Sequence, residues 1–304
     1  MHLSILDLIS KAKVAASENW DSVGISIGAL GSDCDRSLWY EHRWAAEKET
    51  FTADKLRIFE DGHYAEKQIL DDLERAGILV AREDTDTGKQ FKVFALGGHV
   101  RGKLDGEALI DNVVHVVEAK SHNDRSFKAL EKDGVQKSKP AHYWQCQYYC
   151  HLRGRKFALY LAKNKNTSKL YAEVIPYDAV AVMRMEGRLA NIINAPLAPE
   201  RASENPEAFV CRFCRAKPVC HKEAFGRRNC RTCTASTPII TDGEDAVWKC
   251  ELHECELPID QQKVGCRDHL YHKDVVPGEQ NDSGDDWIAY ALVDGTQWVN
   301  GVQA

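Results

Sequence analysis

Three residues near the middle of the chain carry side chains that can act on a phosphodiester bond. Glu118 and Lys120 stand two residues apart in VVHVVEAK, and Asp105 lies upstream in GKLDGEALI. Because side chains alternate along a strand, Glu118 and Lys120 are expected on one face of a sheet and Ala119 on the other. A hairpin between the two segments would bring the Asp105 carboxylate alongside Glu118.

This grouping fits metal-dependent phosphodiester hydrolysis. The carboxylates of Asp105 and Glu118 would hold Mg²⁺ or Mn²⁺, and the carbonyl of Ala119 could complete the coordination. The metal polarises the phosphate and lowers the pKa of a bound water, while Lys120 stabilises negative charge or orients the nucleophile. Each short motif also has a plainer interpretation, as an Asp-Gly turn and as an exposed strand face.

Two further pairs of residues have spacings that fit the same site. His63 and Glu66 lie three apart on a predicted helix before the sheet, so both can approach the metal. Gln145 and Tyr149 lie four apart on a later predicted helix and can face the same cleft. Solvated or ordinary amphipathic helices would show the same spacings.

The elements that position these residues alternate between helix and strand. Residues 1–76 are predicted to be mostly helical, with a break at 24–31, and Gly77 ends the last helix. Short apolar runs from 78 to 120 predict successive hairpin strands of one sheet. A helix near 139–152, two strands (FALYLAK and KLYAEVIPY) and a helix near 178–194 complete an α/β pattern.

Composition and charge set wider limits. The 304 residues are 43% hydrophobic and 28% charged, without an apolar run long enough to span a membrane. The N-terminal segment lacks the continuous apolar core of a secretory signal, so we expect a cytoplasmic protein with reduced thiols. The eleven cysteines are then better explained as metal or cluster ligands. A net charge of −6 still permits a local basic groove for DNA.

Most of the cysteines fall into two groups. Cys211, Cys214 and Cys220 form a C-x2-C-x5-C motif, and Cys34 is their only distant upstream partner. Cys146 and Cys150, on the helix of Gln145, are interpreted as small buried residues. As a fourth ligand far upstream, Cys34 would join the N-terminal helices to the C-terminal end of the nuclease core.

The second group lies in a tail that begins after Pro196 and consists mostly of loop-type sequence. Paired ligands separated by a hairpin-sized loop predict a zinc ribbon or treble-clef-like module. The preferred zinc ligands are Cys230, Cys233, Cys250 and Cys266. Cys255, His253 or His269 could replace the last, and His272 is a further spare. Arg227, Arg228 and Arg231 would form a basic patch. This patch either contacts phosphates or is simply a solvated part of the surface.

The motif order GH..E, GKLDG, EAK and Q...Y resembles the RecB-like branch of the PD-(D/E)XK nucleases, over about residues 30–220. The resemblance implies an α/β, restriction-endonuclease-like core, in which helices flank a mixed central sheet. It implies metal ligation by His63, Asp105 and Glu118, and a catalytic role for Lys120. Gln145 and Tyr149 would lie beside the site.

One early and three late cysteines resemble the iron–sulfur nucleases related to RecB. These include the CRISPR-associated RecB-like family and the AddB helicase-nuclease subunit. The resemblance implies a structural [4Fe–4S] cluster held by Cys34, Cys211, Cys214 and Cys220, although zinc suits the same thiolates. The expected domains are a nuclease domain at 1–225 and a zinc-ribbon-like module at 226–304.

The sequence thus predicts a Mg²⁺- or Mn²⁺-dependent deoxyribonuclease, with exonuclease action on DNA ends or single strands favoured. Arg101 and Lys103 would line the approach for DNA. No phosphate-binding loop of the G-x-x-x-x-G-K-[ST] type occurs, so the chain resembles stand-alone nucleases of phage replication or recombination, or of CRISPR adaptation. Recombination or replication proteins are expected partners. The alternatives are a catalytically inactive nuclease-like DNA-binding or assembly protein, and a metal-dependent hydrolase with another substrate.

Overall fold

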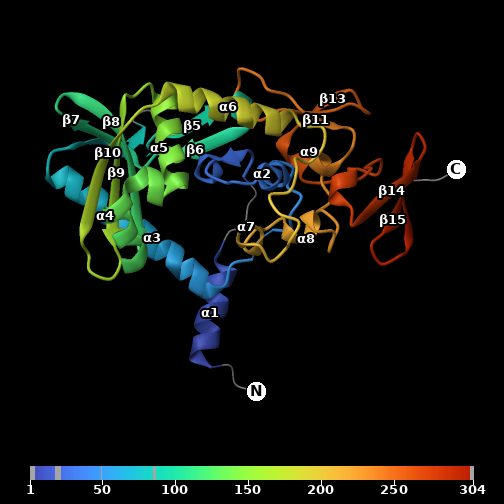
Figure 1. Cartoon of the computed structure of the whole chain (residues 1–304), viewed down its shortest axis with the longest axis horizontal. Coiled ribbons are helices and arrows are strands. Elements are labelled where there is room, and N and C mark those ends of the chain that lie inside the picture. Colours follow the sequence, from blue (N-terminus) through green and yellow to red (C-terminus); the bar gives the residue numbers. More distant parts are fainter. Residues whose placement is uncertain (1–3, 18–21, 49, 85–86, 302–304) are drawn as a thin grey trace.

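The computed structural model describes residues 4–17, 22–48, 50–84 and 87–301. A layered body of sheet and helices forms one end of the molecule, and the cysteine-bearing tail forms the other (Figure 1). Helix α1 (Ile5–Ala15) projects from between them. Within the described ranges, no helix has both the length and the apolar character needed to cross a membrane.

The central sheet has five strands in the order β10-β9-β8-β7-β2. β8 and β9 are parallel, while the other neighbouring strands are antiparallel, so the sheet is mixed as predicted. Its strands are β2 (Leu79–Ala81), β7 (Gly106–Ile110), β8 (Val113–His122), β9 (Phe157–Asn164) and β10 (Leu170–Pro176). The long strand β8 lies at the centre of the sheet, and helices cover both of its faces.

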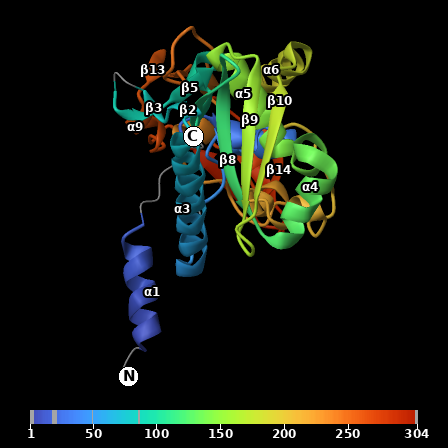
Figure 2. The same ribbon diagram turned by 90° about the vertical axis from the view of Figure 1, so that its left-hand side faces the viewer.

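Helices cover the two faces of this sheet (Figure 2). On one face, α3 (Ala53–Arg75) packs Ile69, Leu70 and Leu73 against apolar side chains of β8 and β9. On the other face lie α4 (Asp124–Ser138), α5 (Pro140–Arg153) and α6 (Ala179–Asn194). The predicted helices near 139–152 and 178–194 are confirmed as α5 and α6, and Gly77 follows α3 with φ +69°.

The prediction of one continuous sheet over 78–120 is wrong. β5 (Lys92–Ala95) and β6 (Val100–Lys103) pair with β1 (Ile25–Ser26) in a separate three-stranded sheet, and β3 (Glu83–Asp84) pairs only with β4 (Lys89–Gln90). The chain changes sheets between β6 and β7. Asp105 therefore lies in the link between two sheets, rather than in a strand.

The tail contains more regular structure than its sequence predicts. Three small strands, β11 (Ser236–Pro238), β12 (Trp248–Cys250) and β13 (Cys255–Leu257), form one sheet. A second antiparallel sheet consists of β14 (Gly278–Ser283), β15 (Trp287–Leu292) and β16 (Gln297–Gly301). Three short helices complete it: α7 (Phe209–Arg212), α8 (Lys217–Cys220) and α9 (Ile259–Gln262).

Arg231 joins the tail to α2 (Asp35–His42), and its place corrects the predicted basic patch. The side chain is fully buried, because its guanidinium donates to the carbonyls of Val23 and His42 and to the Gln262 amide oxygen. It also lies 3.7 Å from the ring centroid of Trp44. A surface patch at 227–231 is thereby reduced to Arg227 and Arg228.

Candidate active site and cysteine groups

The end of β7 creates the candidate active site. β7 begins at Gly106, opposite Val117, whereas β8 continues to His122 alongside β9. The Ala119 amide, beyond the end of β7, donates instead to Asp105 Oδ2 at 2.8 Å. A carboxylate is thus fixed beside β8 by the backbone itself.

Asp105, Glu118 and Lys120 converge, as the sequence predicts. Lys120 Nζ forms an ion pair with Glu118 Oε1 and lies 3.8 Å from Asp105 Oδ2. The same ammonium donates to the Ala119 carbonyl at 3.2 Å. Glu118 is fully buried and Asp105 is 8% exposed, so the two carboxylates lie in a region with little solvent.

The α3 side of the site is an open cavity of about 450 Å³, lined by His63, Glu66, Ala119 and Lys120, among others. Glu66 is hydrogen-bonded to Asp105, which brings a third carboxylate to the group. His63 is exposed one turn earlier on α3. The predicted face of α3 therefore points into this cavity.

Crowded carboxylates change the proton affinities of the group. Burial and the charge of Asp105 raise the pKa of Glu66 to about 7. Burial, opposed by Lys120 and supported by Asp105, raises the pKa of Glu118 to about 8. Burial lowers the pKa of Lys120, but the carboxylates of Glu118 and Asp105 outweigh it and raise that pKa overall. A bound cation would relieve this repulsion.

The donor set fits such a cation. Glu118 Oε2 is buried and has no hydrogen-bond partner among the residues described. A buried carboxylate oxygen without a partner is costly unless a cation or a donor occupies its vicinity. Asp105, Glu118, Glu66 and the Ala119 carbonyl supply the hard oxygen ligands that Mg²⁺ and Mn²⁺ prefer. The three carboxylates do not all lie within 4.8 Å of one another in this structure, where Lys120 Nζ occupies the space beside Glu118.

Gln145 and Tyr149 lie behind the site on α5. The Gln145 amide donates to the Tyr149 hydroxyl at 3.2 Å, and this hydroxyl donates to the Lys103 carbonyl at 2.7 Å. Tyr149 therefore fixes the backbone two residues before Asp105. Because these hydrogen bonds join the pair to each other and to that backbone, Gln145 and Tyr149 position the link that carries Asp105.

Arg101 and Lys103 line a different cavity, of about 560 Å³, together with Lys92 and Phe94. The Arg101 guanidinium donates to the carbonyls of Gly98 and Glu244. Arg101 thus contacts the tail as well as this cavity. Lys103 is exposed, and its carbonyl is the one that Tyr149 binds.

A histidine pair beside Lys120 was missed from the sequence. The Tyr160 hydroxyl lies 2.9 Å from His122 Nε2 and 2.8 Å from His142 Nδ1, and the two imidazole rings stack. Burial and nearby lysines lower the pKa of His122 to about 4 and that of His142 to about 3. The signal was present, because His122 follows Lys120 at the period of a strand.

The four cysteines of the first group surround one small cavity. Cys34 precedes α2, Cys211 lies in α7, Cys214 follows α7, and Cys220 ends α8. Burial and the charges of Cys34 and Cys220, among others, raise the pKa of Cys214. The chain therefore brings one early and three late thiols together, in the combination that the sequence predicts.

The cysteines of the second group also lie near one another. Burial, followed by the charges of Cys266, Cys233 and Cys250, raises the pKa of Cys230 to about 11. Burial raises the pKa of Cys233, although hydrogen bonds from the backbone amides of Ala235 and Leu270 oppose this effect in part. Of the spares, His269 is buried against Tyr271, and His272 is hydrogen-bonded to the Pro196 carbonyl.

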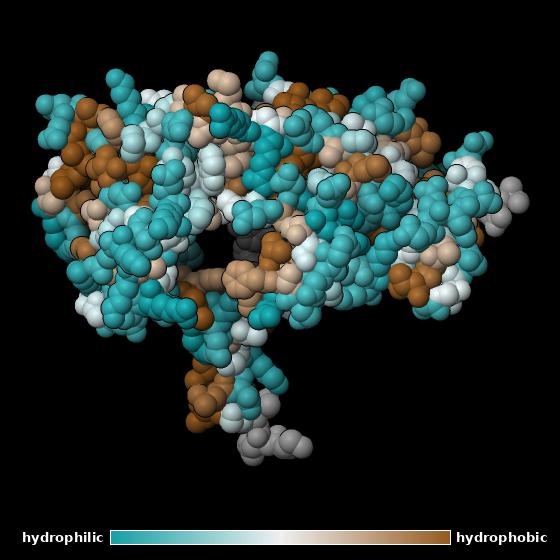
Figure 3. Space-filling view, viewed as in Figure 1, coloured by the Kyte–Doolittle hydropathy of each residue, from teal (hydrophilic) through white to brown (hydrophobic). Residues whose placement is uncertain are grey.

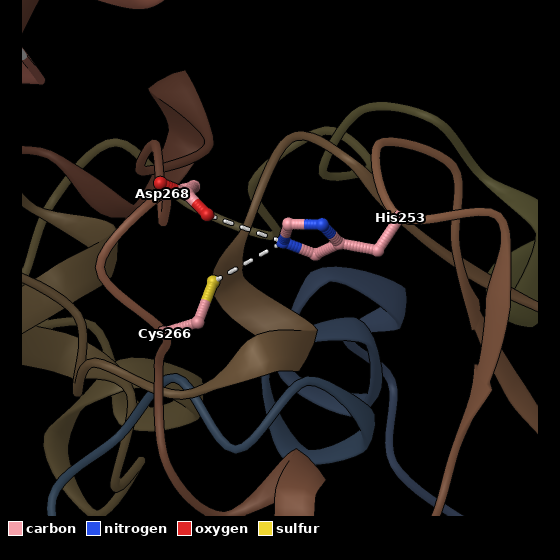
Figure 4. Close-up of side chains that lie close together, drawn as sticks. All are labelled: His253, Cys266 and Asp268. Atoms are coloured by element: carbon pink, nitrogen blue, oxygen red, sulfur yellow. Dashed lines mark hydrogen bonds and ion pairs between the residues drawn. The ribbon is translucent and has the colours of Figure 1, made fainter.

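Neither thiol group is as compact as a closed zinc site. With Zn–S bonds of ~2.3 Å, four tetrahedral sulfurs lie about 3.8 Å apart. Within the described ranges, three ligand atoms approach within 4.8 Å of one another only at His253, Cys266 and Asp268. Figure 4 shows His253 pointing between the other two, at 3.3 Å from Asp268 and 3.9 Å from Cys266. Cys266 therefore has two sets of neighbours that could share a metal with it: the thiols of the second group, and the pair His253 and Asp268.

No protein-family model and no curated protein matches the sequence. Among solved structures, the chain is similar to the crystal structure of SSO0001, with a TM-score of 0.39 and 15% identity over 72% of this chain and 98% of that one. It is similar to an alkaline exonuclease (LHK-Exo) from Laribacter hongkongensis, with a TM-score of 0.40 and 12% identity over 60% of this chain and 90% of that one. It is also similar to the complex of LHK-Exo with dAMP, with a TM-score of 0.38 and 14% identity over 60% of this chain and 90% of that one. Since all three TM-scores lie below 0.5, the function is argued from the site alone.

Proposed function

We propose that the protein is a metal-dependent deoxyribonuclease of the PD-(D/E)XK type, whose reaction centre consists of Asp105, Glu118 and Lys120. One observation carries the proposal. Lys120 contacts both carboxylates beside an open cavity, and the buried Glu118 Oε2 lacks a hydrogen-bond partner among the described residues. A lysine and two carboxylates that meet where β7 ends beside β8 suit phosphodiester hydrolysis better than structural pairing.

Asp105 and Glu118 would hold Mg²⁺ or Mn²⁺, with the Ala119 carbonyl, Glu66 and His63 as neighbouring ligands. When bound, the metal supplies charge to polarise the phosphate and to acidify a water. Lys120, which is protonated at neutral pH because of its raised pKa, stabilises negative charge that develops on the phosphate oxygens. Tyr149, held by Gln145, keeps the Asp105 link in place.

The cysteine groups enter the proposal as structural centres. The first group is proposed to hold a [4Fe–4S] cluster, because its four ligands are thiols alone around one small cavity and match the cysteine order of the iron–sulfur nucleases that the sequence resembles. For the second group we keep zinc at Cys230, Cys233, Cys250 and Cys266, with His253 as the alternative to one cysteine. Iron, sulfide and zinc analyses of Cys34→Ser and Cys233→Ser proteins would assign the two groups separately.

DNA ends or single strands are the proposed substrates, in the setting of phage replication, recombination or CRISPR adaptation. Arg101, Lys103 and Lys92 line one cavity that could receive the DNA backbone. Nuclease (1–225) and zinc-binding (226–304) domains and a cytoplasmic location remain part of the proposal. The buried Arg231 contact means that the two parts would fold against each other.

The test is cleavage of end-labelled single- and double-stranded DNA by purified protein, with Mg²⁺, Mn²⁺ or EDTA. Lys120→Ala is expected to lower the cleavage rate about 100- to 1,000-fold, as loss of one transition-state donor does. Asp105→Ala is expected to lower it at least as much. The matched control is Asp111→Asn, in the exposed turn between β7 and β8, which should cleave like the wild type.

Two results would contradict the proposal. Cleavage that survives both substitutions would place the reaction elsewhere. Metal-independent DNA binding without cleavage by the wild type would favour the alternative of an inactive nuclease-like binding protein.

A further inference from the structure

Two phenylalanines beside the first cysteine group are the most exposed aromatic side chains that stand together in the described part of the molecule. Phe209 is 83% exposed and Phe213 is 79% exposed. Their ring centroids lie 6.4 Å apart in an edge-to-face arrangement. Leaving two aromatic rings in water costs free energy, so such a pair is typical of a binding surface.

The cysteines hold this aromatic pair outward. Cys211 and Cys214 line the small cavity of the first cysteine group. Phe209 and Phe213 line a neighbouring cavity of about 500 Å³, on the other side of the same loop. The sequence FVCRFC thus anchors the loop through its cysteines and presents its phenylalanines to solvent.

Positively charged side chains lie between and beside the two phenylalanines, while Glu207 stands two positions before Phe209 and pairs with Lys217. From Ala208 to Lys222 the chain has no acidic residue, and Arg212 and Arg215 alternate with the phenylalanines. Both arginines are exposed. The acidic side chains at the same cavity, Asp33 and Glu41, belong to the α2 side. A polyanion would therefore be directed to the arginine side of the loop.

A second aromatic and cationic group lies at the start of α3. Phe59 lines the candidate active-site cavity and contacts Phe51 edge to face, at 5.1 Å. Lys55 Nζ lies 5.0 Å from the Phe51 ring centroid. Figure 3 shows an opening in the middle of the molecule, and Figure 1 places α7 and the first turns of α3 at its border. Helices α7 and α3, which carry Phe209 and Phe59, thus border the same opening.

We propose that Phe209 and Phe213 form a stacking platform for the unpaired bases of single-stranded DNA that is bound for the candidate active site. The inference rests on the proposed nuclease function and adds a recognition surface to it. Bases of any sequence stack on aromatic rings, while Arg212 and Arg215 contact the phosphates. A paired duplex keeps its bases stacked inside, so the platform selects single strands.

The experiment measures binding of a fluorescent single-stranded oligonucleotide and of the matching blunt duplex by anisotropy. It is done without chelator and without added Mg²⁺ or Mn²⁺, so that no cleavage occurs and the cysteine groups stay intact. Phe209→Ala is expected to weaken single-strand binding between about 5-fold and about 150-fold, and Phe213→Ala likewise. Duplex affinity should stay unchanged. Phe209→Trp and Phe213→Trp should retain single-strand affinity, because tryptophan also stacks.

The control removes two exposed apolar side chains elsewhere, of which Val180 is 59% exposed and Met183 70% exposed. Val180→Ala with Met183→Ala, on the outer side of α6, should leave single-strand affinity at the wild-type value. Circular dichroism and iron content of each variant show whether the cysteine loop is intact. Loss of affinity in a variant with normal spectra supports the platform.

An unchanged single-strand affinity in the Phe209→Ala/Phe213→Ala protein would overturn the inference. Loss of self-association or of a protein contact, with DNA binding retained, would overturn it in favour of a protein-docking surface. The nuclease proposal fails separately, because its test is cleavage. A wild type that binds single strands through the platform without cutting them would contradict that proposal alone.

Discussion

The candidate active site and the cysteine-bearing tail are held in place by different forces. Asp105 and Glu118 are positioned by strand pairing and by helices packed on both faces of a five-stranded sheet. The tail consists of two three-stranded sheets and short helices, with two small apolar clusters around Trp248 and Tyr290. Because this region has so little core, we expect its folding to depend on the metal binding proposed for its thiols.

Metal removal should separate the two regions most strongly. Because structural thiolate sites contribute on the order of 10 kcal/mol to folding, chelation should unfold the segment around Cys230 to Cys266. The central sheet should remain folded. Amide hydrogen exchange followed by mass spectrometry would show lost protection in β11 to β13, with β8 and β9 unchanged. Equal loss in both regions, or in neither, would contradict the comparison.

The buried Arg231 should matter next. Arg231→Met removes a guanidinium that donates to two backbone carbonyls and to Gln262, and so leaves buried acceptors without partners. We expect a loss of about 2–4 kcal/mol in the free energy of unfolding, measured in urea. Arg228→Met is the matched control, since Arg228 is exposed and donates to the Cys266 carbonyl at the surface. Similar losses of unfolding free energy in both variants would show that Arg231 does not hold the tail against α2.

A smaller effect is expected from filling the close contact between Gly102 and Tyr149, the residue that holds the backbone before Asp105. A Cβ at Gly102 would lie 2.9 Å from both Cε1 and Oη of Tyr149 and 3.0 Å from Ile27 Cδ1. Gly102→Ala should cost about 1–3 kcal/mol of stability and shift the Tyr149 hydrogen bond to Lys103. Cleavage should fall more than in Gly187→Ala, where the added Cβ on α6 meets open space. Wild-type cleavage by Gly102→Ala would show that Tyr149 does not position the site.

Acid should weaken the sheet region through its histidine pair. Burial holds the pKa of His142 at about 3, below its unfolded value of ~6.5, so the unfolded state binds more protons between these values. The stabilisation is present above pH 6.5 and is lost as the pH falls toward 3. Between pH 7 and pH 5 the loss should be about 1–2 kcal/mol for this histidine.

The measurement is urea unfolding of wild type and His142→Gln at both pH values. The variant should lose less stability than the wild type, whereas His151→Gln, a half-exposed position on the same helix, should behave like the wild type. Parallel losses in wild type and His142→Gln would contradict the assignment.

The sequence predicted the site better than its surroundings, and the reason is geometric. Glu118 and Lys120 share a face because strand side chains alternate, so a short motif determines their relation. Asp105 was expected on a strand, yet it lies in a link between two sheets. No local pattern specifies which strands pair across 25–103, since that depends on long-range contacts.

Some elements had usable signals that the sequence analysis passed over. Asn123 caps α4 by accepting from the Ser126 amide, and Asp-Gly at 294–295 connects β15 to β16 with Gly295 at φ +84°. Both are local start and turn signals. The burial of Arg231 had no such signal, because its partners at Val23, His42 and Trp44 are nearly two hundred positions away in the chain.

The central claim is that Asp105 and Glu118 hold a divalent metal at the reaction centre. Calorimetric titration of Mn²⁺ into wild type, Asp105→Asn and the control Asp111→Asn tests it most directly. The account predicts that Asp105→Asn weakens Mn²⁺ affinity at least about tenfold, or 1.4 kcal/mol, while Asp111→Asn binds as tightly as the wild type. Equal Mn²⁺ affinity in all three proteins would contradict it.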